Sequence, residues 1–191
     1  MCGRIATLVQ ETAPEDCLAR LLFNEEPRDG LARAFFRRAA VLVAALLDWH
    51  DASCADEQSM DARAELAVSG LVGLGPGLTP SGDDFLCGML VALLAAGETR
   101  AAAELGRWIK RTSADATTPL SRAFLAAACA GEANEALHAL IAGVLSADVG
   151  LLDRGLVLLA RSGHTSGWDM LAGAMAVLSC PKPPLRVRMR G

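Results

Sequence analysis

Two stretches of the sequence carry a serine and a carboxylate at the same spacing, in a form that could bind a polar ligand. The first begins at Ser81 and reads Ser-Gly-Asp-Asp-Phe-Leu-Cys-Gly. The second begins 85 residues later (166 − 81), at Ser166, and reads Ser-Gly-Trp-Asp-Met-Leu-Ala-Gly. The shared pattern is Ser-Gly-x-Asp, two large apolar residues and a further glycine. It predicts two helix starts, each with Ser as the N-cap and Asp at the third helical position.

A weaker third copy lies between these two. Thr118-Pro119 repeats Thr79-Pro80, and a Phe-Leu pair follows both at the same distance. Thr118 is predicted to cap a helix that has Pro119 at its first position. The hydroxyl of Ser121 belongs to the same helix start. Helix capping alone explains any one copy, but three copies favour a shared binding site.

The loop in front of the first copy, residues 73–80, holds three glycines and two prolines. Glycine adopts turns that other residues do not, so main-chain N–H groups of this loop could approach a ligand closely. We therefore predict a binding loop. No Lys follows the glycines, and the last glycine of Gly-x-Gly-x-x-Gly is missing, which disfavours both common kinds of nucleotide-binding loop.

The charges at these helix starts limit the ligand. Each helix N-terminus offers about half a positive charge, whereas Asp83, Asp84 and Asp169 together carry about three negative ones. If the carboxylates converge, they favour a divalent cation or a ligand with N–H donors, such as an amide, carbamoyl or ureido group. If the carboxylates only cap helices, an anionic ligand remains an alternative. His164 could donate to a carbonyl or act as an acid or base, or could simply pack.

Together, residues 75–88, 117–125 and 163–169 resemble the AllH-like family, and the similarity extends over most of 30–178. The AllH member of that family works with FdrA-type and AllG-type proteins as an oxamate carbamoyltransferase in anaerobic allantoin breakdown. The resemblance implies transfer of a carbamoyl group between an oxamate-type amide nitrogen and phosphate. Such a reaction needs oxyanion donors and proton transfer. It also implies a small carbamoyl or carboxylate ligand and FdrA-like and AllG-like partner subunits.

We expect one pocket lined by the loop 73–84 and by the helix starts at 117–121 and 164–169. The expected catalytic residues are Asp84, His164 and Asp169. The expected substrate-binding residues are Gly75, Gly77, Thr79, Ser81, Gly82, Asp83, Thr118, Ser121, Thr165 and Ser166. By residue chemistry, Asp83 or Asp84 would hold N–H groups and His164 would move a proton. The hydroxyls would bind carboxylate or phosphate oxygens.

Two other classes of function stay open. Asp83, Asp84 and Asp169, with His164, could bind Mg²⁺ or Mn²⁺ in a hydrolase, since hard oxygen ligands suit those ions. Apart from that alternative we expect no metal and no cofactor. The chain could instead be a non-catalytic helical subunit whose Ala-rich faces bind another chain, and assembly into a homo-oligomer is also open.

The composition limits the class of protein to which this chain can belong. A length of 191 residues suits one domain. Hydrophobic residues make up 52% and charged residues 21%, which excludes intrinsic disorder. The net charge of −4 and the absence of Tyr disfavour a nucleic-acid partner. The longest charge-free apolar stretches, near 39–47 and 85–97, are shorter than the roughly 20 residues of a membrane span.

The cysteines and the start of the chain predict a reducing cytoplasm. No apolar signal core follows the first residues, and the six cysteines are scattered along the chain. No Cys-x-x-Cys pair occurs, which leaves structural zinc with little support. We expect the cysteines to be buried as small hydrophobes.

The periodicity predicts an all-α, single-domain bundle of about seven to eight helices. We expect helices near 30–49, 56–71, 82–96, 99–112, 119–130, 132–145, 149–161 and 167–178. Residues 3–9 and 185–189 alternate in a way that favours strands, and the two ends are expected to pair as a short ribbon. The chain then divides into an N-terminal segment (1–29), the AllH-like helical domain (30–180) and a basic, Pro-rich tail (181–191).

Overall fold

The computed structural model describes residues 2–23, 30–50 and 57–179. Within these ranges it holds nine α-helices, one 3₁₀ helix and no strand, so the predicted all-α fold is confirmed. No helix in this described part is long and apolar enough to cross a membrane. The elements are α1 (Cys2–Thr12), η1 (Leu18–Phe23), α2 (Gly30–His50), α3 (Glu57–Leu71), α4 (Ser81–Ala95), α5 (Thr99–Ala116), α6 (Pro119–Cys129), α7 (Glu135–Ser146), α8 (Val149–Leu159) and α9 (Ser166–Leu178).

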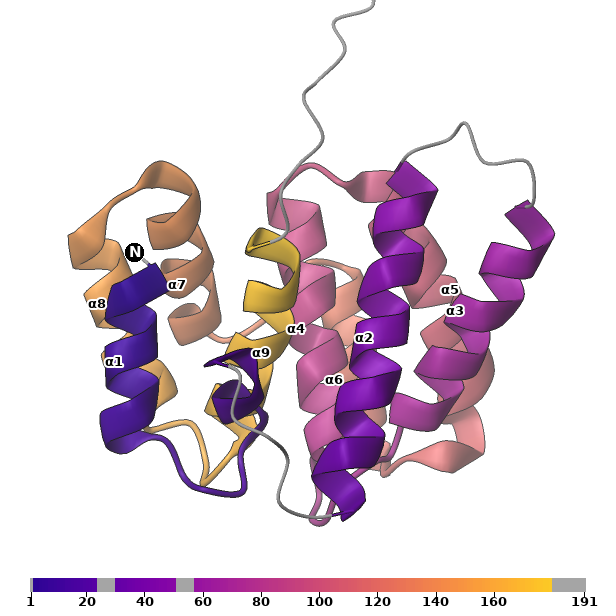
Figure 1. Cartoon of the computed structure of the whole chain (residues 1–191), viewed down its shortest axis with the longest axis horizontal. Coiled ribbons are helices and arrows are strands. Elements are labelled where there is room, and N and C mark those ends of the chain that lie inside the picture. The colour runs from indigo at the N-terminus through magenta and orange to yellow at the C-terminus, as the bar shows by residue number, and fades with distance from the viewer. Residues whose placement is uncertain (1, 24–29, 51–56, 180–191) are drawn as a thin grey trace, which may run out of the picture.

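Helices α4 and α9 form the centre of the molecule (Figure 1). Helices α1, α7 and α8 lie on one side of this pair, and α2, α3 and α5 lie on the other. Every residue of α4 from Gly82 to Leu93 is buried, as expected for a helix that is apolar around its whole circumference. The two predicted Ser-Gly-x-Asp helices are therefore the two that the rest of the fold encloses.

Glycines let α4 and α9 touch backbone to backbone. A Cβ atom added at Gly88 would overlap the carbonyl oxygen of Met170, and one added at Gly173 would overlap that of Phe85. Since the obstructing atoms are main chain, they cannot move aside as a flexible side chain could. The second glycine of each repeat is thus required for close helix packing.

The predicted strand at 3–9 is wrong, because these residues lie inside helix α1. Ile5 and Val9, four residues apart, are both fully buried, so the apolar residues follow one face of a helix. Residues 185–189, the predicted partner strand, lie outside the described residues. The eight predicted helices correspond to α2–α9, with ends displaced by at most four residues. Helix α1 accounts for the ninth.

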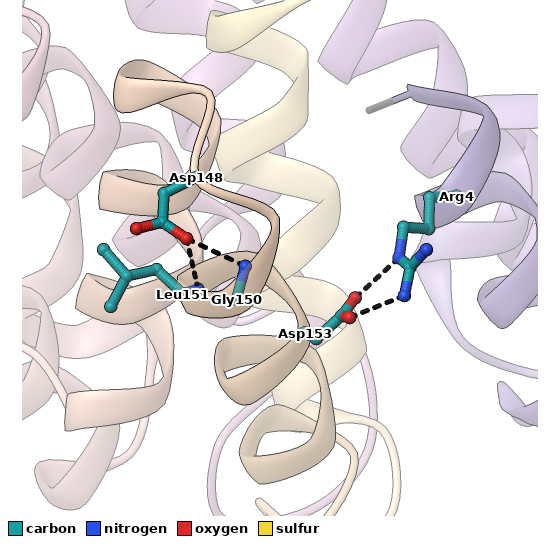
Figure 2. Close-up of polar contacts among 5 residues, drawn as sticks. All are labelled: Arg4, Asp148, Gly150, Leu151 and Asp153. Atoms are coloured by element: carbon teal, nitrogen blue, oxygen red, sulfur yellow. Dashed lines mark hydrogen bonds and ion pairs between the residues drawn. The ribbon is translucent and has the colours of Figure 1, made fainter.

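The N-terminal segment packs into the same core as the helical domain. Leu18 of η1 is buried against α9. Figure 2 shows the guanidinium of Arg4 in α1 donating to both carboxylate oxygens of Asp153 in α8, at 2.7 and 2.6 Å. The same view shows Asp148 capping α8 by accepting from the backbone N–H groups of Gly150 and Leu151. Of the free cysteines in the described part, Cys17 and Cys87 are buried and Cys129 is exposed.

Candidate functional site

The two central helices begin one residue earlier than the capping pattern predicts. The N-cap positions are Pro80 for α4 and Thr165 for α9, and neither makes a side-chain cap hydrogen bond. Ser81 and Ser166 are the first helical residues, so Asp84 and Asp169 fall at the fourth position and not the third. The predicted serine caps are therefore wrong. The serine hydroxyls are turned instead toward the opposite helix, as described below.

The predicted cap of the third copy is confirmed. Thr118 accepts a hydrogen bond from the backbone N–H of Ser121 at 3.1 Å, with Pro119 at the first helical position. The Thr118 hydroxyl also donates to the carbonyl oxygen of Leu78 in the glycine-rich loop. This contact joins the start of α6 to the loop, across 40 residues of sequence.

Both carboxylate oxygens of Asp83 already accept hydrogen bonds from other residues of the protein. Its Oδ1 accepts from the backbone N–H of Gly73 at 2.9 Å. Its Oδ2 accepts from the hydroxyl of Ser121 at 2.7 Å and from that of Thr117. The side chain is fully buried. Asp83 thus fastens the loop and the start of α6 to α4, a positioning role that sequence reasoning missed.

The glycine-rich loop requires glycine at several positions. Gly75 has a φ of 120°, and a Cβ added there would lie 2.8 Å from the backbone nitrogen of Ser81. Gly77 has a φ of 92° but has open space around it. The backbone N–H of Gly82 donates to the carbonyl oxygen of Leu74 at 2.8 Å. The N–H of Gly82 is therefore used inside the loop, and we assign it no ligand.

The loop also reaches the start of α9. The hydroxyl oxygens of Thr79 and Ser166 lie 3.0 Å apart and share a hydrogen bond. The loop, the start of α6 and the start of α9 are therefore brought together. They meet as a packed, hydrogen-bonded layer.

Asp84 and Asp169 are buried at the centre of this layer, with 2% and 0% of their surface exposed. Burial raises the pKa of Asp84 to about 7, against the hydrogen bonds from Ser166 and Thr79, and the nearby charges of Asp169 and Asp83 raise it further. Burial likewise raises the pKa of Asp169 to about 6, and hydrogen bonds from Leu18, Ser81 and Thr165 oppose that rise. Both carboxyls thus titrate close to neutral pH, a range suited to proton transfer.

One oxygen of each carboxyl has no hydrogen-bond partner. These atoms are Oδ2 of Asp84 and Oδ2 of Asp169, and both are inaccessible to solvent. Leaving a buried acceptor unpaired costs about 1–3 kcal/mol. Each oxygen is therefore stabilised by gaining a proton or by accepting a hydrogen bond from a donor that enters the site.

A cavity of about 340 Å³ lies beside Asp84. Its walls come from α4, α6, α9 and the α6–α7 connection. The lining residues are Asp84, Cys87, Phe124, Ala127, Ala128, Glu132, Ala133, Asn134 and Met170. Of the predicted site residues, only Asp84 lines this cavity. Thr79 and Ser166, which hydrogen-bond to Asp84, belong to the layer that holds it.

His164 faces solvent. Its side chain is 77% exposed, and its Nε2 lies 3.5 Å from a carboxylate oxygen of Asp16, which is itself 69% exposed. This position does not suit proton transfer to a ligand beside the fully enclosed Asp84. Asp16, which had no place in the predicted site, is the group that His164 contacts.

The described residues offer no ready metal site. Within 2–23, 30–50 and 57–179, no group of three or more His, Cys, Asp and Glu is arranged to hold an ion. Asp83 already accepts three hydrogen bonds. The hydrolase alternative therefore gains no support from the arrangement of its three aspartates.

A family model described as oxamate carbamoyltransferase subunit AllH matches residues 71–178. The match runs from the last residue of α3 to the last residue of α9, so it contains the loop and all three helix starts. No solved structure matches the chain. Because the match spans more than half of the 191 residues, the chain belongs to the family of the oxamate carbamoyltransferase subunit AllH.

Proposed function

We propose that this chain is a subunit of an oxamate carbamoyltransferase-type enzyme and binds a small carbamoyl or carboxylate compound beside Asp84. One observation carries the proposal: Asp84, whose buried carboxyl has an oxygen without a hydrogen-bond partner, is one of the residues beside a cavity. Buried polar atoms in native proteins almost always have a partner, so an orphaned one points to a missing ligand, water or proton. Membership of the AllH family supplies the class of compound.

The reaction proposed joins an oxamate-type amide nitrogen to a carbamoyl carbon. The nitrogen attacks that carbon in carbamoyl phosphate, the C–N bond forms, and the C–O bond to phosphate breaks with its electron pair leaving on phosphate. The nitrogen must lose a proton, and the carboxylate of Asp84 is the proposed acceptor. Its pKa of about 7 suits this task in both directions, because the same carboxyl returns the proton when phosphate attacks.

The remaining residues of the layer position Asp84. The hydroxyls of Ser166 and Thr79 hydrogen-bond to its carboxyl. Asp83 holds the loop from which Thr79 projects. Asp169 is a second carboxyl that raises the pKa of Asp84 by its charge. We therefore propose Asp84 as the catalytic residue and the others as positioning residues.

Phosphate binding requires groups from other subunits. Among the described residues that line the cavity none is Lys or Arg, and Glu132 adds a second acidic group. A phosphate dianion placed there would meet like charge without a counter-ion. FdrA-like and AllG-like subunits are the proposed source of the missing cations, and the complete active site is proposed to form between chains.

Thermal unfolding with separate ligands tests the binding proposal. Oxamate, oxalurate, carbamoyl phosphate and Mg²⁺ are added one at a time to the full chain, alone and with its partner subunits. A ligand at 100 times its dissociation constant stabilises the folded state by about 2.7 kcal/mol. A shift with oxamate or oxalurate that needs no metal is expected. A shift with Mg²⁺ alone would favour the hydrolase alternative.

Turnover by the assembled subunits tests the catalytic role. Asp84→Asn keeps the shape of the side chain but cannot take a proton, so kcat should fall by about 10²–10⁴-fold. Asp153→Asn, on the surface of α8, serves as the matched control and should leave kcat unchanged. Equal turnover of Asp84→Asn and the wild type would remove Asp84 from the mechanism.

A further inference from the structure

A second cavity, of about 770 Å³, lies between helices α5 and α6 and shares no lining residue with the cavity beside Asp84. Helix α5 lines it at every turn from Thr99 to Ala114, and α6 lines it from Arg122 to Cys129. At a rise of 1.5 Å per residue, the wall that α5 forms is about 22 Å long. The cavity is therefore an elongated groove between two helices.

Two contacts show how the walls of this groove run. A Cβ added at Gly106 in α5 would lie 3.2 Å from the Sγ of Cys129 in α6. Toward the other end, the guanidinium of Arg122 in α6 donates to the carbonyl oxygen of Ala114 in α5. The two helices are therefore antiparallel along the groove. Other lining side chains are also small, namely those of Ala102, Ala103 and Ala126. A bulky apolar group can thus come close to both helices.

The charges along the groove are all positive. Among the described residues that line it are Arg107, Lys110 and Arg122, and none is Asp or Glu. Arg107 also forms an ion pair with Glu104, the residue three positions before it in α5. Lys110 forms no ion pair with another described residue, and the carbonyl that Arg122 contacts is uncharged. Since the whole chain has a net charge of −4, the groove is a basic exception on an acidic protein.

A polar side chain at one wall of the groove has no partner within the protein. Ser113 is only 6% exposed and lines the groove. Its hydroxyl makes no hydrogen bond to another described residue, yet it is not among the unpaired atoms that solvent cannot reach. Buried polar groups in native proteins almost always have a partner. The Ser113 hydroxyl is therefore satisfied only by a group that comes from outside the fold, either water or an occupant of the groove.

The length of the groove distinguishes between two kinds of occupant. Its volume alone would also suit a small ligand, since such sites span roughly 300–1,000 Å³. A small ligand, however, does not extend along 22 Å of helix, whereas a helix of about 15 residues has this length. An amphipathic helix lays its apolar side into a groove of this kind. The basic residues beside the groove then select a helix whose flanking residues are acidic.

We propose that the groove between α5 and α6 binds an acidic, amphipathic helix of a partner chain. The apolar side of that helix packs between α5 and α6 on the small side chains. Its carboxylates pair with Lys110 and Arg122, and with the donors that Arg107 has left beside Glu104. The inference goes beyond the proposed function and does not depend on it, because it rests on the shape and the charges of a groove that carries none of the proposed chemistry.

Three designed peptides, each added to the full chain, test the inference. All three have about 15 residues and Leu at alternating spacings of three and four, which forms one apolar face. Their polar positions carry Glu in the first, Gln in the second and Lys in the third. Fluorescence anisotropy gives the affinities, and maleimide labelling of Cys129, which is exposed and lines the groove, reports the place of binding.

The Glu peptide should slow labelling of Cys129 at least fivefold. It should bind at least tenfold more tightly than the Gln peptide, and its affinity should fall as salt is added, because the pairs are near the surface. The Lys peptide should not bind. Octanoate, a small apolar anion, should leave the labelling rate unchanged.

Variants with matched controls locate the interaction. Lys110→Glu should weaken binding of the Glu peptide at least fivefold, whereas Arg161→Glu makes the same change of charge at an exposed position outside the groove and should have no effect. Ala126→Leu fills the groove and should also weaken binding, whereas Ala123→Leu, exposed on the same helix outside the lining, should not.

Each labelling rate is taken as a ratio, with and without peptide. This is necessary because burial raises the pKa of the Cys129 thiol and the charge of Lys110 lowers it, so Lys110→Glu changes the rate by itself.

Four outcomes would overturn the inference. The first is no protection of Cys129 by the Glu peptide, and the second is equal affinity for the Glu and Gln peptides. The third is equal protection by octanoate, which would make the groove a small-molecule site. The fourth is self-association of the chain alone, measured by sedimentation and abolished by Lys110→Glu, which would make a second copy of this chain the occupant.

Discussion

Replacing Asp84 by Asn should make the folded chain more stable at pH 8. In the unfolded chain this carboxyl titrates near 3.8, and in the folded chain burial raises its pKa to about 7. Between these two values the folded state holds a proton that the unfolded state has lost. The contribution of Asp84 to stability is therefore complete below about pH 4 and is lost as the pH rises through 7.

The size of the effect follows from that difference in pKa. Each pKa unit corresponds to 1.36 kcal/mol, so ionisation of Asp84 costs the folded state about 4 kcal/mol at pH 8, as an upper bound. Asn is neutral at every pH and can still accept from the hydroxyls of Ser166 and Thr79. Asp84→Asn should thus raise the free energy of unfolding by roughly 2–4 kcal/mol at pH 8 and change it by less than about 1 kcal/mol at pH 4.

Urea unfolding followed by circular dichroism at pH 4, 6 and 8 measures this difference. Asp83→Asn is the matched control in the same helix turn. Asp83 accepts three hydrogen bonds, and Asn would turn an NH₂ group toward one set of donors, so this variant should be less stable than the wild type by about 3 kcal/mol. A loss of stability in Asp84→Asn at pH 8, or a gap from the wild type that is the same at all three pH values, would refute the reasoning.

Three further predictions test the packing, the caps and the thiols. Gly88→Ala and Gly173→Ala should each cost about 3 kcal/mol or more in urea unfolding, because the new Cβ overlaps main chain. At Gly3 an added Cβ would meet open space, so Gly3→Ala should instead raise the free energy of unfolding by about 0.5–1 kcal/mol. Asp148→Ala removes the cap of α8 and should cost about 1 kcal/mol in the same assay. Maleimide labelling of the native chain at pH 8, read by peptide mass spectrometry, should modify Cys129 faster than Cys17, since burial raises the pKa of the Cys17 thiol to about 11. Comparable rates at the two thiols would contradict the burial of Cys17.

The sequence predicts the helices of this fold well because the apolar periodicity of each is strong and local. It fails at 3–9, where Ile5 and Val9 fit both a strand and one face of a helix over so short a stretch. Only the packing of α1 onto the rest of the core decides between the two. The serine caps fail because Pro80 and Thr165 take the N-cap positions, so each helix begins one residue earlier than the Ser-x-x-Asp spacing suggests.

The sequence predicts which segments form the candidate site, but it does not predict the role of each residue in them. The three repeats correctly indicate that the loop and two helix starts meet. Sequence reasoning cannot tell Asp83 from Asp84, because neighbouring residues of a helix point in directions about 100° apart, and only the fold shows which of them meets donors. The role of Leu18 was equally hidden, since a backbone N–H carries no signal in the sequence.

The two Ser-Gly-x-Asp helices bury two acidic side chains, Asp84 and Asp169, at the centre of the fold. Two equivalent carboxyls with unpaired oxygens would leave two costly sites in the core. At Asp169 the backbone N–H of Leu18 pairs Oδ1 and leaves Oδ2 without a partner. At Asp84 the cost of burial is expressed in a pKa raised to about 7. The stability that Asp84→Asn should gain at pH 8 is therefore the free energy that burying the ionised carboxylate costs the wild type.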